Sequence, residues 1–339
     1  MFYWSNRQGK PIIKKTEKNC CVPEDFYSTT NYPTFVYHNE KWVQVEEQRM
    51  DAVIVQKDDR FFATKLRDVK AGDLIVCSDE GVCIDAQLED KGEEQRFQFM
   101  DSAVSSEKRN ELILKELAKS LVKEKKQLTV VCGPAVVHTG ANKYLAQLID
   151  EGYVKAVLAG NAVAVHDMEQ CFFNTSLGVD KDTALLTHHG YRNHMKAINR
   201  IMNAGSIENA VKQEILTSGI MYSCVVNNVP FALAGSLRDD GPLPETQMNM
   251  IEAQKEYNKH LREADIVIVL STMLHGIASG NMLPIQIPMY CVDISANVVT
   301  KLSDRGSSQN VGVVTDVGLF LKFLLHEIHE STLTLETES

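Results

Sequence analysis

The densest group of charged side chains that could do chemistry is Arg238, Asp239 and Asp240, which follow an apolar run in the segment PFALAGSLRDDGPLP. An arginine in such a place can bind a carboxylate through two parallel hydrogen bonds. An adjacent aspartate can act as a general acid or base. The same three residues could equally form a solvated salt bridge in a loop, because charged triplets are common in loops. The sequence leaves both interpretations open.

Three histidines could transfer protons near neutral pH. His138 lies in GPAVVHTG, and His275 directly follows an apolar run, so that it is well placed to contact a ligand. His166 falls inside an expected helix, where a hydrogen-bonded structural histidine is the stronger interpretation. His138 and His275 are therefore the better candidates for chemistry.

The remaining histidines and the cysteines do not indicate a metal site or a nucleophile. His188, His189 and His194 lie close together in THHGYRNHMK, but their spacing matches no common zinc site, and no cysteine or carboxylate lies at a ligand spacing. Cys224 lies in a helical apolar pattern without a histidine at a relay spacing, which favours a core position. We predict no metal.

These candidate residues must be positioned by a regular framework, and six apolar runs of strand length provide it. They alternate with helical segments, the first of which is an amphipathic helix over 106–125. Strands that are apolar on both faces and separated by helices are typical of a parallel sheet covered by helices on both faces. We predict an α/β fold with a Rossmann-like, mostly parallel six-stranded sheet. The runs are 128–133, 154–160, 230–236, 265–271, 289–294 and 311–316.

The ends of these runs carry small, polar or acidic residues, and ligands of open α/β sheets bind outside the carboxyl ends of the strands. The chain contains no G-x-G-x-x-G. Gly160 would instead permit close backbone approach at the start of a helix, whose amides suit a phosphate, and Asn161 could add a hydrogen bond. Asp293 could bind a ribose diol, and Asp316 is placed similarly. Turn and cap formation explains any single strand end equally well.

An acidic residue beside the adenosine ribose favours NAD over NADP, because it would repel a 2′-phosphate. Arg305 could neutralise such a phosphate, so that NADP stays open as an alternative. We favour NAD.

A second region has the period of strands. Residues 30–98 alternate in a β manner and contain three pairs of short strands around polar turns at 38–40, 57–59 and 79–81. This pattern predicts a small antiparallel β domain before the α/β domain. We predict an N-terminal extension over 1–24, the small β domain over 25–100, the Rossmann-like NAD-binding catalytic domain over 101–330 and a C-terminal tail over 331–339.

Composition narrows the classes of protein. A net charge of −10 argues against non-specific nucleic-acid binding. The longest apolar stretches are strand-sized, and the N-terminus lacks the order of a signal peptide. Scattered cysteines without C-x-x-C suggest reduced thiols. We therefore expect a cytoplasmic protein that binds neither nucleic acid nor membrane. The helical stretch 191–228 could supply the face of a homo-oligomer.

Taken together, seven motifs in this order resemble the archaeal-type ornithine cyclodeaminase family, long labelled a LOR/SDH bifunctional enzyme conserved domain. They also resemble the C-terminal part of arginine dihydrolase–ornithine cyclodeaminase fusion enzymes. The resemblance covers about residues 22–328, including PEDFYSTTNYPTFV. The motifs are GPAVVHTG, AGNAVAVHD, SLGVD, TSGIMY, PFALAGSLRDDGPLP, STMLHGIASGN and DISANVVTKLSDRGS.

The resemblance implies conversion of L-ornithine to L-proline and ammonia, with NAD in the Rossmann-like domain. Such a reaction needs a cation for the α-carboxylate, for which we predict Arg238, and a base, either Asp239 or Asp240. His138 or His275 would protonate the departing ammonia, and Asp240 could contact either substrate or cofactor. The implied cofactor contacts are Asn161, Ala162, Asp240, Thr272, Met273, Leu274, His275, Asp293, Asp316 and Val317.

Two alternatives remain. The first is a net amino-acid or saccharopine-type dehydrogenase, which would produce NADH in step with substrate. The second is a protein that binds NAD without turnover. Relatives usually have a further small α/β module before PEDFYSTTN, whereas residues 1–22 precede that motif here.

Overall fold

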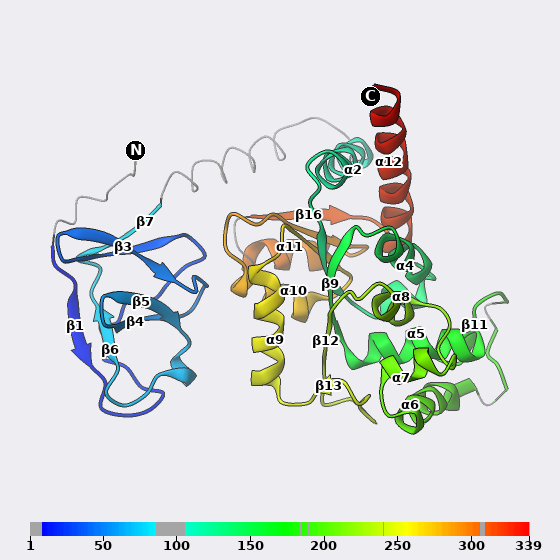
Figure 1. Ribbon diagram of the computed structural model, residues 1–339, viewed down its shortest axis with the longest axis horizontal. Coiled ribbons are helices and arrows are strands. Elements are labelled where there is room, and N and C mark those ends of the chain that lie inside the picture. Colours follow the sequence, from blue (N-terminus) through cyan, green and yellow to red (C-terminus); the bar gives the residue numbers. More distant parts are fainter. Residues whose placement is uncertain are drawn as a thin grey trace. The chain divides into compact units, whose positions relative to one another are not determined.

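The computed structural model describes residues 9–85, 106–183, 185–188, 190–239, 241–305 and 309–338, which fall into two compact units (Figure 1). The first unit consists of residues 1–102, 280–287 and 306–309. The second consists of residues 103–279, 288–305 and 310–339.

The first unit is built on one seven-stranded sheet. Its strands are β1 (Ile12–Lys15), β2 (Thr34–His38), β3 (Lys41–Glu46), β4 (Val53–Lys57), β5 (Arg60–Thr64), β6 (Leu74–Cys77) and β7 (Val82–Ile84). They lie in the order β1-β6-β4-β5-β3-β2-β7, and all neighbours pair antiparallel except β3 and β5. Side chains such as Val36, Ile54 and Phe61 are fully buried in one cluster. This burial accounts for the alternating pattern in the sequence.

The predicted strand pairs are present, with differences in how they join. β2 and β3 form a hairpin around Asn39 and Glu40, both with positive φ, and β4 and β5 form one around Asp58. β6 and β7 also flank a polar turn, but they pair with different strands. β1 extends the sheet N-terminal of residue 25, where we predicted the domain to begin.

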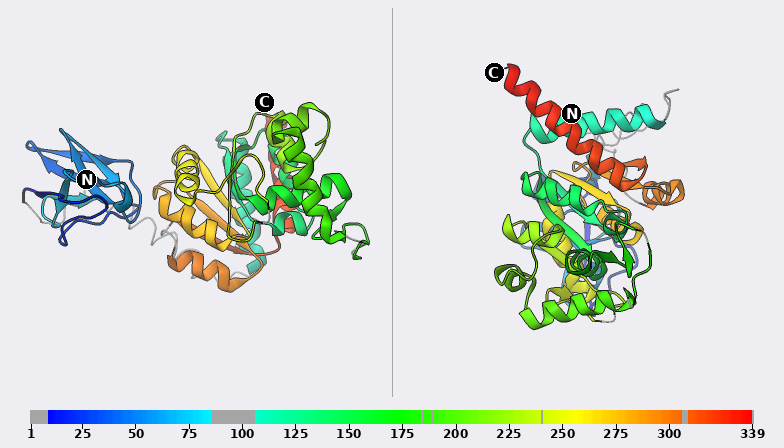
Figure 2. Two further views of the ribbon diagram at one scale, coloured as in Figure 1. Left: turned by 90° about the horizontal axis from the view of Figure 1, so that it is seen from below. Right: turned by 90° about the vertical axis from the view of Figure 1, so that its right-hand side faces the viewer.

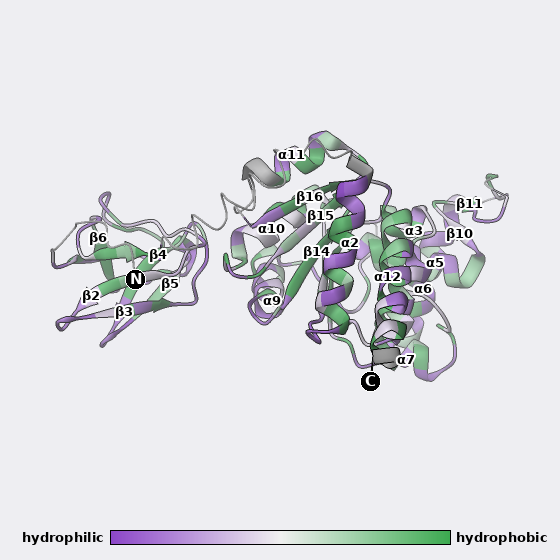
Figure 3. Ribbon diagram, turned by 90° about the horizontal axis from the view of Figure 1, so that it is seen from above, coloured by the Kyte–Doolittle hydropathy of each residue, from purple (hydrophilic) through white to green (hydrophobic). Residues whose placement is uncertain are grey.

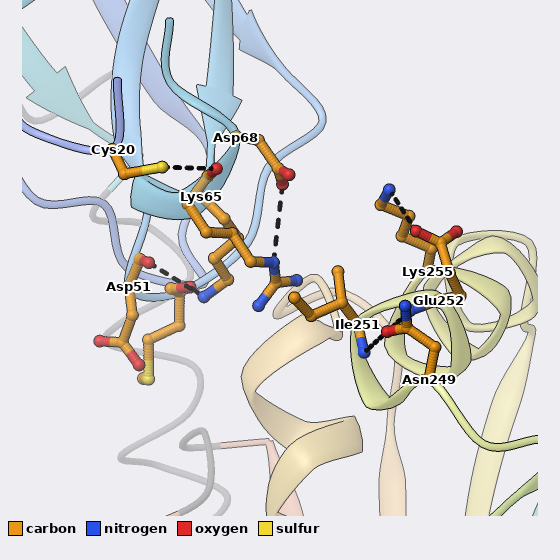
Figure 4. Close-up of polar contacts among 10 residues, drawn as sticks. Cys20, Asp51, Lys65, Asp68, Asn249, Ile251, Glu252 and Lys255 are labelled. Carbon is orange, nitrogen blue, oxygen red and sulfur yellow. Dashed lines mark hydrogen bonds and ion pairs between the residues drawn. The ribbon is translucent and has the colours of Figure 1, made fainter. Parts of the chain in front are cut away.

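Lys65 fixes one loop of this unit. Its ammonium donates to the backbone carbonyls of Met50, at 2.7 Å, and Asp51, at 2.9 Å (Figure 4). Burial, and then the nearby charge of Arg49, lower the pKa of Lys65 to about 8. Because Asp51 has a positive φ, the two bonds hold the loop in a sparsely populated backbone conformation.

The second unit contains a parallel sheet, as predicted. Its strands are β8 (Leu128–Cys132), β9 (Val154–Gly160), β12 (Phe231–Ala234), β13 (Thr246–Gln247), β14 (Ile266–Leu270), β15 (Met289–Asp293) and β16 (Asn310–Val314). Every neighbouring pair is parallel. The six predicted strands are confirmed. The sheet has seven strands, however, because the two-residue β13 joins β12, and it is too short to give an apolar run.

The strand order of this sheet reverses in its centre. The order is β13-β12-β9-β8-β14-β15-β16. Without the short β13, the strands follow in the order third, second, first, fourth, fifth, sixth, which is that of dinucleotide-binding sheets. The reversal lies between β8 and β14, from which the chain leaves in opposite directions. In open α/β sheets, the crevice that binds a ligand lies outside the carboxyl ends of two such strands.

Two residues pack tightly at this reversal. Gly133 follows β8 and donates its N–H to the carbonyl of Leu270, at 2.8 Å. A Cβ on Gly133 would lie only 2.1 Å from the carbonyl oxygen of Ser271, which follows β14 and has a φ of +48°. Only glycine permits this approach of the two backbones.

Helices cover both faces of the sheet, as expected. Figure 2 shows helices on both sides of the sheet, which is the arrangement that right-handed crossovers produce when they leave the centre in opposite directions. β14 between them is apolar along its whole length and fully buried (Figure 3). The helices are α2 (Ser106–Val122), α3 (Ala135–His138), α4 (Asn142–Asp150), α5 (Asn161–Phe173), α6 (Asn193–Ala204), α7 (Ile207–Lys212), α8 (Ile220–Val226), α9 (Met250–Arg262), α10 (Met273–Met282), α11 (Ala296–Arg305) and α12 (Val317–Glu338).

Three details complete the second unit. A two-stranded hairpin of β10 (Thr175–Ser176) and β11 (Val179–Asp180) follows α5. α12 continues through Glu338 and so crosses residue 331, where we predicted a tail to begin. Within the described ranges, no helix has both the length and the apolar character needed to cross a membrane.

The packing at the reversal predicts the effect of a single methyl group. In Gly133→Ala, the new Cβ would collide with the backbone of Ser271, and we expect a loss of roughly 2–3 kcal/mol in the free energy of unfolding. Gly160→Ala is the matched control, because its Cβ would lie 3.4 Å from the His275 ring and its φ is −83°. Urea unfolding of both variants measures the difference. Equal stabilities would contradict the packing.

Candidate functional site

The segment after β14 forms the start of α10 at the crevice. Thr272 precedes the helix, and Met273 and Leu274 begin it with side chains that are 40% and 74% exposed. The first backbone N–H groups of a helix have no partner within it and attract anions. Thr272, Met273 and Leu274 thus lie where a ligand of the crevice would meet α10.

His275 is held in one orientation by Tyr257. The Tyr257 hydroxyl donates to the carbonyl of Ala159, at 2.8 Å, and lies 3.0 Å from His275 Nδ1. Because the hydroxyl hydrogen is used on Ala159, Nδ1 must carry the hydrogen of the second bond, which leaves Nε2 as an acceptor. Burial lowers the pKa of His275, so that the ring is neutral at pH 7. The Cε1 edge of the ring faces Gly160.

The start of α9 sets the position of Tyr257. Asn249 caps this helix by accepting hydrogen bonds from the backbone N–H groups of Ile251, at 3.0 Å, and Glu252, at 3.4 Å (Figure 4). Asparagine at this position is among the strongest helix caps. Two turns later, Tyr257 is buried against Ala159.

Asn161 has a structural partner that the sequence did not reveal. Its side chain is 3% exposed, and its Oδ1 accepts from the Leu243 N–H, at 3.0 Å, and from Thr246 Oγ1, at 2.8 Å. This oxygen therefore ties the loop after β12 to the start of α5. The neighbouring Ala162 is partly exposed in the first turn of α5.

Two strand-end aspartates cap the helices that follow them. Asp293 Oδ1 accepts from the Ser295 N–H, at 2.8 Å, and Asp316 Oδ1 accepts from the Leu319 N–H, at 2.9 Å. The second oxygen of Asp293 accepts no hydrogen bond from the described part of the chain, so it is available to a ribose hydroxyl. Val317 is 2% exposed, which leaves only its backbone for a ligand.

The charged loop after β12 is partly used by its own turn. Asp239 Oδ2 accepts from the Ser236 N–H, at 2.6 Å, and the Arg238 N–H donates to Ser236 Oγ, at 3.2 Å. The Arg238 side chain is exposed. Asp240 lies outside the described residues. The turn accounts for one oxygen of Asp239 and leaves the Arg238 guanidinium open to solvent.

His138 lies in a different place, at a cavity of about 610 Å³ between α3, α4, β11 and the start of α12. Its Nδ1 lies 2.7 Å from Ser176 Oγ. Partial desolvation, and then the neighbouring His166, lower the pKa of His138, which favours the neutral ring. Asp316 also lines this cavity, whereas Arg238 and Asp239 do not. The structure therefore brings His138 together with Asp316 and not with the charged loop.

A buried carboxylate lies behind His138. The His166 ring contacts the His138 ring at a centroid distance of 4.9 Å, and Glu169 is fully buried beneath. Burial raises the pKa of Glu169, but its hydrogen bonds outweigh this and bring the pKa below its ordinary value. His166 is thus hydrogen-bonded, as we interpreted. The donors to Glu169 are His166 Nδ1, Thr175 Oγ1, and the N–H groups of Leu177 and Gly178.

Sequence reasoning missed the lysines of this cavity. Lys143, Lys181 and Lys322 line it from α4, from the segment after β11 and from α12. Lys181 follows the motif SLGVD, but its proximity to the other two depends on packing between distant segments. Only the Glu169–His166 spacing, three residues apart in a helix, was visible in the sequence.

The remaining candidates are placed as follows. Cys224 is fully buried, and burial raises the pKa of its thiol, which fits a core residue. In the described ranges, no three His, Cys, Asp or Glu side chains cluster closely enough to hold a metal ion. His189 lies outside these ranges.

Comparison with known proteins gives consistent matches. Residues 112–324 match the family described as "Arginine dihydrolase ArgZ-like, C-terminal, Rossmann fold", and residues 33–114 match its "first region". The chain is 48% identical over 321 residues to an ornithine cyclodeaminase of Methanothermobacter thermautotrophicus, covering 93% of this chain and 78% of that protein. These matches confirm the resemblance inferred from the motifs.

Two solved structures are similar to the chain. A LOR/SDH protein of Methanococcus maripaludis S2 superposes with a TM-score of 0.86 at 41% identity, covering 96% of this chain and 98% of that one. The ternary complex of AgrE with ornithine and NAD⁺ superposes with a TM-score of 0.64 at 44% identity, covering 98% of this chain and 47% of that one.

The lowered pKa of His275 predicts how stability depends on pH. The folded ring binds a proton less readily than the unfolded ring, whose ordinary pKa is 6.5. The unfolded state therefore gains protons first, and the free energy of unfolding decreases as the pH falls below about 6.5. Urea unfolding at pH 7.5 and pH 5.5 should show a smaller decrease for His275→Gln than for the wild type. Identical decreases would contradict the assignment.

Proposed function

We propose that this chain, which belongs to the arginine dihydrolase ArgZ-like C-terminal family, is an ornithine cyclodeaminase that converts L-ornithine to L-proline and ammonia. The observation that carries the proposal is the strand reversal between β8 and β14, with Asp293 beside it, in a chain 48% identical to an archaeal ornithine cyclodeaminase. A crevice of this kind is where α/β sheets bind dinucleotides.

The residues at the crevice fit NAD. The first amides of α10, which follows the central strand β14, suit a pyrophosphate. Asp293 has an oxygen free for the adenosine ribose, and its charge disfavours a 2′-phosphate. Arg305, which could offset that charge, keeps NADP as the alternative. The proposed cofactor contacts are Asn161, Ala162, Asp240, Thr272, Met273, Leu274, His275, Asp293, Asp316 and Val317.

When bound, NAD supplies a reversible hydride acceptor, so that ornithine oxidised at Cα can cyclise through its δ-amine, release ammonia and regain the hydride as proline. His138 has the properties needed to transfer protons during this reaction. Its neutral ring can take up a proton and pass it to the departing amine. Ser176 at Nδ1 fixes the ring, and Glu169 holds His166 against it.

Arg238, Asp239 and Asp240 remain the candidates that the sequence offers for the carboxylate partner and the base. The exposed guanidinium of Arg238 supports this role, because it has no ion pair with the described residues. One oxygen of Asp239 remains for a proton. The homo-oligomer and the cytoplasmic location stay predictions.

The proposal predicts the products of a simple assay. Purified protein with L-ornithine and NAD⁺ should release proline and ammonia in equal amounts, without a net increase in NADH absorbance. NADH formed in step with substrate would instead identify a net dehydrogenase. NAD binding without product would identify a protein that only binds the dinucleotide. Omission of NAD⁺, after removal of bound nucleotide, is the control and should abolish turnover.

A further inference from the structure

The cavity beside His138 carries an unbalanced positive charge. Lys143, Lys181 and Lys322 line it, and none of the three has a carboxylate within ion-pair distance among the residues that the structure describes. The cavity also contains Asp180 and Asp316. Asp180 Oδ1 already accepts hydrogen bonds from its own turn, and Asp316 caps α12.

Two of these lysines repel each other. Partial desolvation lowers the pKa of Lys181, and the charge of Lys143 lowers it further, by more than either Asp182 or Asp167 raises it. An anion between the two ammonium groups would relieve this repulsion. The charge of the two ammonium groups therefore suits an anionic ligand.

The local structure places both lysines at the cavity. The Lys181 side chain lies across Gly140, where a Cβ would come within 3.3 Å of Lys181 Cε. The Lys181 N–H donates to the Asn174 carbonyl, at 3.0 Å, which fixes its backbone. The Lys143 ammonium lies 4.8 Å from the centre of the Tyr144 ring. Both lysines are solvent-exposed, so that their ammonium groups are accessible to a ligand of the cavity.

We propose that Lys143 and Lys181 bind the α-carboxylate of the amino-acid substrate in this cavity, next to His138. This inference rests on the proposed function and assigns the carboxylate to a different cation from Arg238, which does not line the cavity. The cavity volume of about 610 Å³ accommodates a small amino acid. Asp316, a proposed cofactor contact, lines the same cavity, so substrate and dinucleotide sites adjoin.

The test measures ornithine turnover by Lys181→Met and Lys143→Met and compares it with a control variant and with a variant of Arg238. Each lysine substitution removes the charge and keeps a long apolar side chain. We expect each to raise the ornithine KM roughly tenfold, because a hydrogen bond to a charged group is lost, with the Kd for NAD⁺ unchanged. Lys212→Met is the matched control, since Lys212 pairs with Glu208 on α7 and does not line this cavity. Arg238→Met tests the competing assignment.

Two half-substrates separate carboxylate binding from other losses. Pentanoate carries the carboxylate without the amines, and 1,4-diaminobutane carries the amines without the carboxylate. Lys181→Met should raise the inhibition constant of pentanoate and leave that of 1,4-diaminobutane unchanged. Equal shifts for both probes, an unchanged ornithine KM, or a weaker Kd for NAD⁺ would overturn the assignment. The assignment would also be overturned if only Arg238→Met weakened the binding of pentanoate and left that of 1,4-diaminobutane unchanged.

Failure of this inference can be told from failure of the proposed function. A wild-type protein that makes no proline and ammonia from ornithine would refute the function. In that case, calorimetric titration of pentanoate into wild type and Lys181→Met still tests the lysines. Weaker binding to the variant would support them as a carboxylate site, and equal binding, or no binding to either protein, would overturn them.

Discussion

The close packing of Gly133 against Ser271 is the constraint on which the second unit depends. The two residues leave neighbouring strands at the point where the strand order reverses, and their backbones approach within a distance that excludes any side chain at position 133. Ser271 adopts a positive φ there, an uncommon conformation for a residue with a side chain. Because the chain leaves the two strands in opposite directions, their carboxyl ends are the place where a sheet of this kind binds a ligand.

The strand ends divide into residues that build the framework and residues that remain open. The side-chain oxygen of Asn161 holds the loop after β12, and Val317 is buried at the start of α12. Asp293 does both, because one oxygen caps α11 while the other is open. A strand end that is polar in the sequence is therefore not by itself evidence of a ligand contact. The hydrogen bonds of its side chain within the protein determine whether a polar atom remains for a ligand.

The framework could be predicted from the sequence because burial on both faces leaves uninterrupted apolar runs, as in β8 and β14. β13 could not be predicted, since two residues carry no periodicity. The partners of Asn161 lie more than 80 residues away along the chain, and the cavity at His138 forms only when α3, α4, β11 and α12 pack together. The sequence therefore identified single candidate residues, but it could not identify the residues that contact them in the folded protein.

The proposed reaction requires that hydride leaves Cα of ornithine and returns to the same carbon at one site. Turnover of L-ornithine deuterated at Cα tests this most directly. If the cofactor is recycled within each turnover, the proline formed retains deuterium at Cα over many cycles, and the free nucleotide stays unlabelled. Loss of deuterium to solvent, or its accumulation in free NADH, would contradict the account.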